Sequence, residues 1–106
     1  MDTQIDKVCK EKLTRNLLKV AKYNHAASSF LHQQRYEQAM LHFSWTLDVI
    51  DNGVDICKAG LTNGVDKEKY ADHLKLLMAL RNSIETTMTF ISVAMHAAGG
   101  ADQPVN

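Results

Sequence analysis

The sequence contains few residues that interrupt regular structure. Proline occurs once, near the C-terminus, and there are five glycines. Because proline and glycine most often end helices, their scarcity predicts long helices separated by short connections. A chain of 106 residues, 45% of them apolar, is long enough to bury one hydrophobic core and too apolar to remain disordered. We therefore expect a single folded domain.

Cysteine is also scarce. The two cysteines, Cys9 and Cys57, fall within helical patterns and not in a spaced framework of pairs. Buried, reduced thiols in a cytoplasmic protein are the first interpretation. The alternative is a disulfide, because an antiparallel hairpin that turns near Gln34 would bring the two cysteines to the same level.

Long apolar runs are missing as well, and the pattern of a leader segment is not seen after Met1. No basic stretch followed by apolar residues comes after Met1, so we expect no signal peptide. The apolar runs fall far short of the ~20 residues that are needed to span a bilayer. We expect a cytoplasmic protein that does not act on membranes.

The chain has no net charge, since 12 basic residues balance 12 acidic residues. Such a balance does not steer a protein toward nucleic acid. Six basic residues do fall in the first helical segment, but they spread around the helix, alternate with acidic residues and have no aromatic residues interleaved. They are Lys7, Lys10, Lys12, Arg15, Lys19 and Lys22. This pattern argues against a nucleic-acid partner. The alternative function is nevertheless a small nucleic-acid-associated regulator that uses the basic first helix.

The clearest periodic pattern lies in the middle of the chain. Eight apolar residues alternate steps of four and three, which is the spacing of one helical face over almost four heptads. They are Tyr36, Met40, Phe43, Leu47, Ile50, Val54, Cys57 and Leu61. Because the pattern keeps its phase across residues 51–53, we expect one continuous helix over about 35–61, with a break at Gly53 as the alternative.

Two further helices are expected, over about 4–33 and about 66–97, because the same alternating spacing runs through both segments. Residues 86–93 have the composition of a strand, but a lone strand leaves its backbone unpaired, so we expect helix there too. Short connections make neighbouring helices antiparallel. The predicted fold is an all-α, up-down-up antiparallel bundle of about three long helices.

The C-terminal end is expected to lie outside this bundle. Gly99 and Gly100 follow the last periodic residues and are expected to end the third helix. The predicted organisation is one helical domain over 1–98 and a flexible C-terminal tail over 99–106.

Residues 23–46 resemble the helix pair of a tetratricopeptide repeat. The family's spacing of bulky, small and aromatic residues is matched on the first helix by Tyr23, Ala26, Ala27 and Phe30 and on the second by Tyr36, Ala39 and Phe43, with Thr46 where the family prefers alanine. Residues 35–39 also resemble a turn of microtubule-interacting-and-transport domains, which are three-helix bundles. The resemblance covers about a quarter of the chain. It implies a protein that binds peptides or helices in a groove without catalysis.

Residue types typical of catalytic and metal sites are present, but not at the spacing that such sites need. The five histidines include no Glu-x-x-His pair, and neither cysteine lies in a Cys-x-x-Cys motif. Asp48, Asp51 and Asp55 form an acidic row that lacks a fourth oxygen ligand and is expected to face solvent. No serine is flanked by glycines, and no cysteine is next to a histidine. We expect no enzymatic activity, no metal and no cofactor.

A second apolar face on the middle helix is the feature most informative about function. At 100° per residue, four large apolar residues cluster on the side opposite to the eight-residue pattern. They are Leu41, Trp45, Val49 and Ile56. A helix that is apolar on two faces is buried on both, so this face packs against the other helices or against another chain.

We interpret these four residues as a binding surface for a protein partner, either a second copy or a different chain. The expected function is a non-enzymatic interaction module, such as an adaptor, an assembly factor or a chaperone. The alternative places Trp45 in the core of the monomer, against the third helix.

Overall fold

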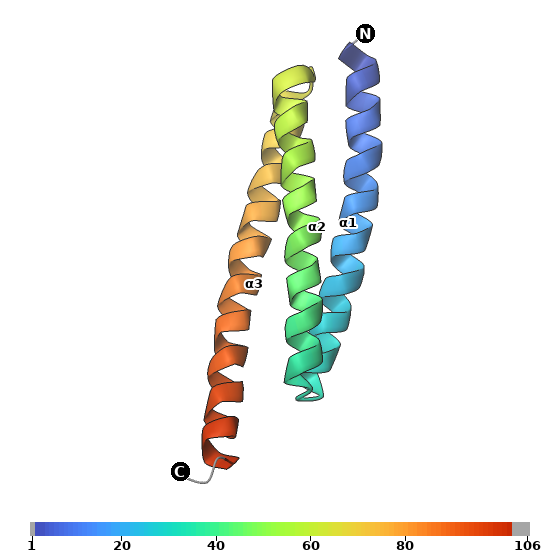
Figure 1. Cartoon of the computed structure of the whole chain (residues 1–106). Coiled ribbons are helices and arrows are strands. Elements are labelled where there is room, and N and C mark those ends of the chain that lie inside the picture. The colour runs from blue at the N-terminus through green and yellow to red at the C-terminus, as the bar shows by residue number, and fades with distance from the viewer. Residues whose placement is uncertain (1, 103–106) are drawn as a thin grey trace.

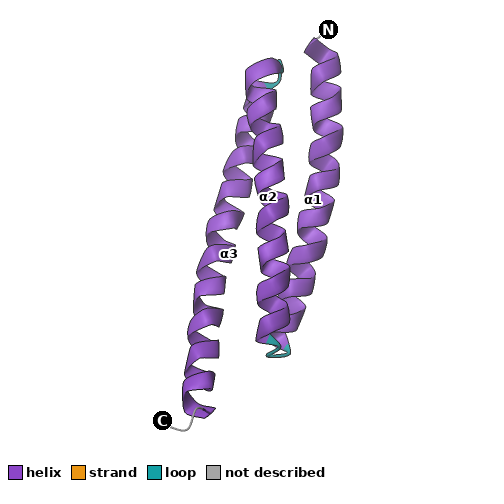
Figure 2. Ribbon diagram, in the orientation of Figure 1, coloured by secondary structure: helices purple, strands orange, loops and turns teal. Residues whose placement is uncertain are grey.

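The computed structural model describes residues 2–102, and it describes the side chains of residues 4–97. Its three helices are α1 (Asp2–His32), α2 (Tyr36–Asn63) and α3 (Lys67–Asp102). Neighbouring helices run antiparallel, and no strand occurs in the described part of the chain (Figures 1 and 2). The predicted all-α, up-down-up bundle of three long helices is confirmed.

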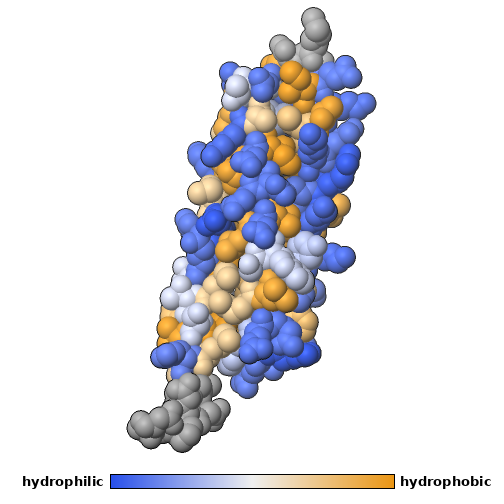
Figure 3. All heavy atoms as spheres, viewed as in Figure 1, coloured by the Kyte–Doolittle hydropathy of each residue, from blue (hydrophilic) through white to orange (hydrophobic). Residues whose placement is uncertain are grey.

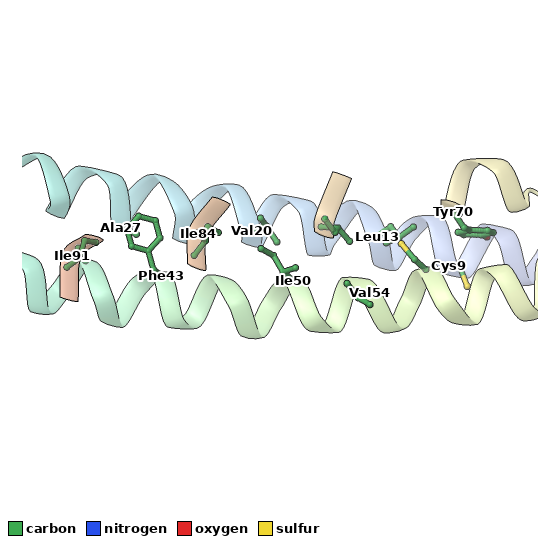
Figure 4. Close-up of a cluster of buried hydrophobic side chains, with 13 residues drawn as sticks. Cys9, Leu13, Val20, Ala27, Phe43, Ile50, Val54, Tyr70, Ile84 and Ile91 are labelled. Atoms are coloured by element: carbon green, nitrogen blue, oxygen red, sulfur yellow. The ribbon is translucent and has the colours of Figure 1, made fainter. Parts of the chain in front are cut away.

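Helix α2 lies in the centre of the bundle and packs against both α1 and α3 (Figure 1). The apolar residues predicted from the alternating spacing are buried or half-buried in all three helices. In Figure 4 the side chains of Val20 from α1, Ile50 from α2 and Ile84 from α3 meet in the interior. The core is therefore one continuous layer along the bundle axis, built from one face of each helix.

The connection between α1 and α2 is a tight turn at Gln34, as predicted. Gln34 has a φ of 59°, in the left-handed region that non-glycine residues seldom adopt. Two backbone hydrogen bonds hold it: the Gln34 N–H donates to the carbonyl oxygen of Leu31 at 2.9 Å, and the Arg35 N–H donates to that of Phe30 at 2.9 Å. The turn sets the antiparallel register of α1 and α2.

Helix α2 is continuous through Gly53, so the alternative of a break there is wrong. Gly53 is buried where α1, α2 and α3 approach each other. A Cβ atom at this position would lie 2.3 Å from Asn16 Oδ1 and 2.9 Å from Leu77 Cδ1. The Asn16 side chain uses the space to donate a hydrogen bond from Nδ2 to the carbonyl oxygen of Val49 at 2.7 Å. The glycine serves close packing of helices and not a turn.

We predict that Gly53→Ala destabilises the bundle. Alanine would gain about 1 kcal/mol of helix propensity, but its Cβ would displace Asn16 and Leu77, and such overpacking costs about 1–3 kcal/mol or more. Urea denaturation should therefore show a lower free energy of unfolding. The matched control is Asn52→Ala at the exposed neighbouring position, which should be neutral or stabilising by about 0.5 kcal/mol. If both variants gain stability equally, the packing role of Gly53 is refuted.

Asp6 ties the start of α1 to the connection between α2 and α3. Its Oδ1 accepts a hydrogen bond from the Tyr70 hydroxyl at 2.7 Å, and both carboxylate oxygens accept from the Val65 N–H at 3.2 Å. Nearby, Lys10 Nζ lies 3.0 Å from Asp66 Oδ2. The Tyr70 hydrogen bond and the Val65 N–H lower the pKa of Asp6 although burial opposes them. The ionised carboxylate is therefore the form that the folded chain stabilises.

This pKa shift predicts a loss of stability in acid. A carboxyl whose pKa is lowered on folding stabilises the fold above its ordinary value of 3.8, and this contribution is lost as the pH falls through the lower folded value. Asp6→Asn should melt below the unaltered chain at pH 7, and the difference should shrink below pH 3.8. Asp72→Asn, at an exposed position of α3, is the control and should melt like the unaltered chain. A difference that is the same at pH 7 and pH 2.5 would contradict this role for the charge.

Helix α3 extends past the turn between α1 and α2 (Figure 1). It continues through Gly99 and Gly100 to Asp102, so the expectation that these glycines end the helix is wrong. Glycine lowers helix propensity but keeps its N–H and carbonyl groups, so the hydrogen-bond ladder can pass through it. The expected tail over 99–106 therefore starts as helix, and residues 103–106 of it lie outside the described residues.

The segment 86–93 is helical, as predicted despite its strand-like composition. The hydroxyls of Thr86, Thr87 and Thr89 each donate a hydrogen bond at 3.0 Å to the carbonyl oxygen four residues earlier. These bonds satisfy the hydroxyls within the helix. The threonines are therefore compatible with α3 without a second strand.

Candidate protein-binding surface

The four residues predicted to bind a partner differ in exposure. Leu41 is 48% exposed and Trp45 is 42% exposed, whereas Val49 and Ile56 are half-buried and pack against the core. This row of four residues on α2 is thus covered unequally along its length. The neighbouring helices cover the Val49 and Ile56 end of the row and leave the Leu41 and Trp45 end open to solvent.

Trp45 packs on a residue of α1 and is 42% exposed, so the alternative that placed it in the core against the third helix is wrong. Its ring contacts Tyr23 edge-on, with ring centroids 6.0 Å apart. The ring centroids of Trp45 and His42 are 4.8 Å apart, and those of His42 and Phe30 are also 4.8 Å apart. The Arg35 guanidinium lies over the Phe30 ring at 5.3 Å. An aromatic cluster from α1 and α2 therefore holds the indole in place while part of it faces solvent.

One ring nitrogen of His42 takes part in a hydrogen bond with the backbone of α2. Nδ1 lies 2.8 Å from the carbonyl oxygen of Gln38, which can only accept, so Nδ1 carries the proton of this bond. The bond fixes the ring between Phe30 and Trp45. The role of His42 here is to support the indole.

A shallow groove runs along the junction of α1 and α2 from Trp45 toward Ile56. Two adjoining depressions form it, and Val49 lines both. The remaining lining residues are Tyr23, Trp45 and Asp48 in the first and Lys12, Arg15, Asn16, Lys19, Asn52, Asp55 and Ile56 in the second. We call this surface the α1–α2 groove. Trp45 and Ile56 are 11 positions apart, so the groove spans about three helical turns, or ~16 Å.

The two rims of the α1–α2 groove carry opposite charge. Lys12, Arg15 and Lys19 line it from α1, and Asp48 and Asp55 line it from α2. Its floor between them includes the apolar side chains of Val49 and Ile56. This combination of an apolar floor, an aromatic end and two charged rims is suited to an amphipathic helix with charges on both flanks.

Sequence reasoning missed the contribution of α1 to this surface. Positions 12, 16, 19 and 23 have the alternating spacing of four and three, as the core residues do. They therefore form a strip beside the core face of α1. The strip is polar apart from Tyr23, and its two lysines, Lys12 and Lys19, belong to the basic run of the first helix, so hydrophobic periodicity does not identify it.

Four of the six basic residues of α1 take part in ion pairs or line the groove. Lys10 pairs with Asp66, and Arg15 Nη2 lies 3.9 Å from Glu11 Oε2. Lys12 and Lys19 are exposed at the groove rim. Lys7, Lys10 and Arg15 also line a separate depression on α1, together with Asp6 and Glu11. The alternative function, a regulator that binds nucleic acid through the basic first helix, would use this surface.

The acidic row of α2 is exposed, as predicted, and its middle residue pairs with α3. Arg81 Nε donates to Asp51 Oδ1 at 2.9 Å, and the guanidinium also contacts Glu85. Asp48 and Asp55 lie at the groove instead. In the part of the chain with described side chains, no three histidine, cysteine or acidic residues converge on a metal position.

Cys9 and Cys57 are both buried and unpaired, which agrees with the first interpretation and not with a disulfide. Burial raises the pKa of the Cys57 thiol, and the neighbouring Cys9 raises it further. A raised pKa keeps the thiol protonated and unreactive. These cysteines are part of the core.

No family model matches the chain, and no curated protein or solved structure is significantly similar to it. Among residues 2–102, none of the helices combines the length and apolar character that crossing a membrane requires.

We predict that Trp45 contributes less to stability than its buried neighbour Phe43. Phe43 is almost completely buried, so Phe43→Ala should cost about 3–5 kcal/mol. Trp45→Ala removes a ring that is already partly in solvent and should cost about 1–2 kcal/mol. Thermal melts followed by circular dichroism compare the two. A Trp45→Ala variant that unfolds like Phe43→Ala would place the indole in the core and remove the basis for a binding role.

Proposed function

We propose that this chain is a non-enzymatic protein-protein interaction module that acts in the cytoplasm as an adaptor, assembly factor or chaperone. Its binding surface is the α1–α2 groove together with Leu41, and its ligand is an amphipathic helix of a partner protein. The observation that carries the proposal is the exposed pair Leu41 and Trp45 at the end of a groove whose two rims carry opposite charge.

The aromatic end supports the proposal because partly exposed tryptophans are frequent anchors of protein interfaces. Tyr23 and His42 restrict the Trp45 ring, so little side-chain freedom remains to be lost on binding. Leu41 lies one helical turn before Trp45 on the same face, which suits apolar residues spaced three or four apart on a partner helix. The resemblance of residues 23–46 to a tetratricopeptide helix pair covers this same end.

The charged rims define the chemistry of the expected partner. A helix in the groove would place acidic residues beside Lys12 and Lys19 and basic residues beside Asp48 and Asp55. Such flanking pairs steer association and fix orientation more than they add affinity. The partner helix is therefore expected to carry an apolar stripe with opposite charges on its two sides.

The test is capture of a partner with matched variants of the full chain. The double variant Leu41→Ser/Trp45→Ser removes the apolar end, and Leu18→Ser removes an apolar side chain on the outer side of α1 that is 68% exposed. A specific partner should be retained by the unaltered chain and by Leu18→Ser. Its dissociation constant should rise about 30- to 900-fold for the double variant, the range expected for a lost interface anchor.

Two further measurements make this test decisive. Trp45 is the only tryptophan, so its fluorescence must change when the isolated partner is added. Lys12→Glu/Lys19→Glu should slow association, with a smaller effect at high salt. A partner that binds both serine variants equally, or that leaves the Trp45 emission unchanged, refutes the groove as the binding site. Binding of duplex DNA or RNA that weakens steeply with salt would instead favour the nucleic-acid alternative.

A further inference from the structure

Helix α3 carries a second regularly spaced strip, on the side that faces away from the bundle. Its large members are Leu76, Phe90 and Val93, and its small members are Ala79, Ser83, Thr86 and Ala97. Taken in sequence order, these seven residues are separated by alternating steps of three and four positions. At 100° per residue, the strip lies about 130° around the helix from the buried positions Leu77, Ile84 and Ile91. All seven side chains are exposed.

The strip is too apolar for an ordinary solvent-facing helix. Phe90 is 71% exposed, Val93 is 62% exposed and Leu76 is 61% exposed. Between residues 86 and 97 there is no aspartate, glutamate, lysine or arginine. Figure 3 shows one face of the molecule, on which pale and orange residues are more frequent in the lower part and blue residues dominate the upper part. A surface of this kind marks an interaction site.

The spacing indicates that the strip is covered by another helix. Alternating steps of three and four keep side chains on one face along two helices that wind around each other. The strip covers 22 residues from Leu76 to Ala97, which is ~33 Å of helix. The order of large and small residues along this length then selects the partner.

The strip is complementary to itself in antiparallel orientation. If two copies of α3 cross about a two-fold axis at Thr86, residue pairs whose numbers sum to 172 or 173 face each other. Leu76 then meets Ala97 of the second copy, Ala79 meets Val93, Ser83 meets Phe90, and Thr86 meets Thr86. Each large side chain faces a small one, which is the condition for interdigitated packing between helices. A two-fold axis also closes the assembly at two copies.

A parallel pair fits less well. It would place Phe90 against Phe90 and Leu76 against Leu76, and leave Ala79 and Ser83 facing their own copies across gaps. Lys69 and Asp72 continue the same strip toward the start of α3, so each would also meet a like charge. In the antiparallel pair these two residues lie beyond Ala97 of the other copy. Both packing and charge therefore favour the antiparallel arrangement.

We propose that the chain forms an antiparallel dimer through this strip, with the two-fold axis at Thr86 of α3. The occupant of the strip is the same strip of a second copy. No residue of α3 lines the α1–α2 groove, so the dimer leaves that groove open. The dimer is thus a separate property of the chain and does not rest on the proposed partner binding.

The first test is the mass of the full chain in solution. Light scattering and sedimentation equilibrium should give twice the 11.9 kDa of one chain. Phe90→Glu should raise the dimer dissociation constant at least about 30-fold, because it places a charge in a central apolar contact. The matched control is Leu18→Glu on α1, whose side chain is as exposed as that of Phe90. It should leave the dimer intact, and so should Leu41→Ser/Trp45→Ser. Circular dichroism verifies that each variant is folded.

The second test measures orientation by disulfide formation between copies under a mild oxidant. Thr86→Cys lies at the axis, where two cysteines can reach the ~4.4–6.8 Å between Cα atoms that a disulfide needs. It should link two chains. Ala79→Cys should not, because the two copies of residue 79 would be ~21 Å apart along the helix. Linkage of both variants would show a parallel pair and overturn the proposal. A monomeric mass up to high micromolar concentration, or a Phe90→Glu variant as dimeric as the unaltered chain, would also overturn it.

Discussion

The close approach of α1 and α2 is the constraint on which the rest of the bundle depends. Small residues allow it: Ala27 and Ala39 are completely buried, and Gly53 leaves room for Asn16 to reach the backbone of α2. Because the backbones of α1 and α2 are so close, the rings of Tyr23 and Trp45 do not fit between the two helices and pack at the edge of their contact. On one side of the pair α3 completes the core. On the other side the same contact leaves the α1–α2 groove.

Periodicity was enough to predict the three helices and their buried faces. Steps of four and three place residues on one face of a helix whatever that face later meets, so the core positions followed from spacing alone. The contacts of Asp6 with Val65 and Tyr70 could not be predicted in this way, because they join residues 59 and 64 positions apart. They depend on the relative register of α1 and α3, which periodicity does not contain.

The candidate surface was predictable only in part, for a related reason. A helical wheel gives the direction of Leu41, Trp45, Val49 and Ile56 but not what covers each of them. In the folded chain Val49 and Ile56 pack against the core, whereas Leu41 and Trp45 are exposed. The strip on α3 is present in the sequence, but part of it lies in residues 86–93, whose composition is typical of a strand. Ile84 and Ile91 face the core as their spacing predicts, so the strip faces away from it. A helical wheel does not show whether another part of the chain covers that side.

The two proposed surfaces have consequences together that neither has alone. A two-fold dimer through α3 would carry two α1–α2 grooves, related by the same axis that passes near Thr86. A partner with two amphipathic helices, or itself a dimer, would engage both grooves, and the second contact would form at a high effective concentration. A groove only about three turns long binds a single helix with limited area. Doubling it is a physical route by which so small a bundle can hold a partner firmly while each individual contact remains readily reversible.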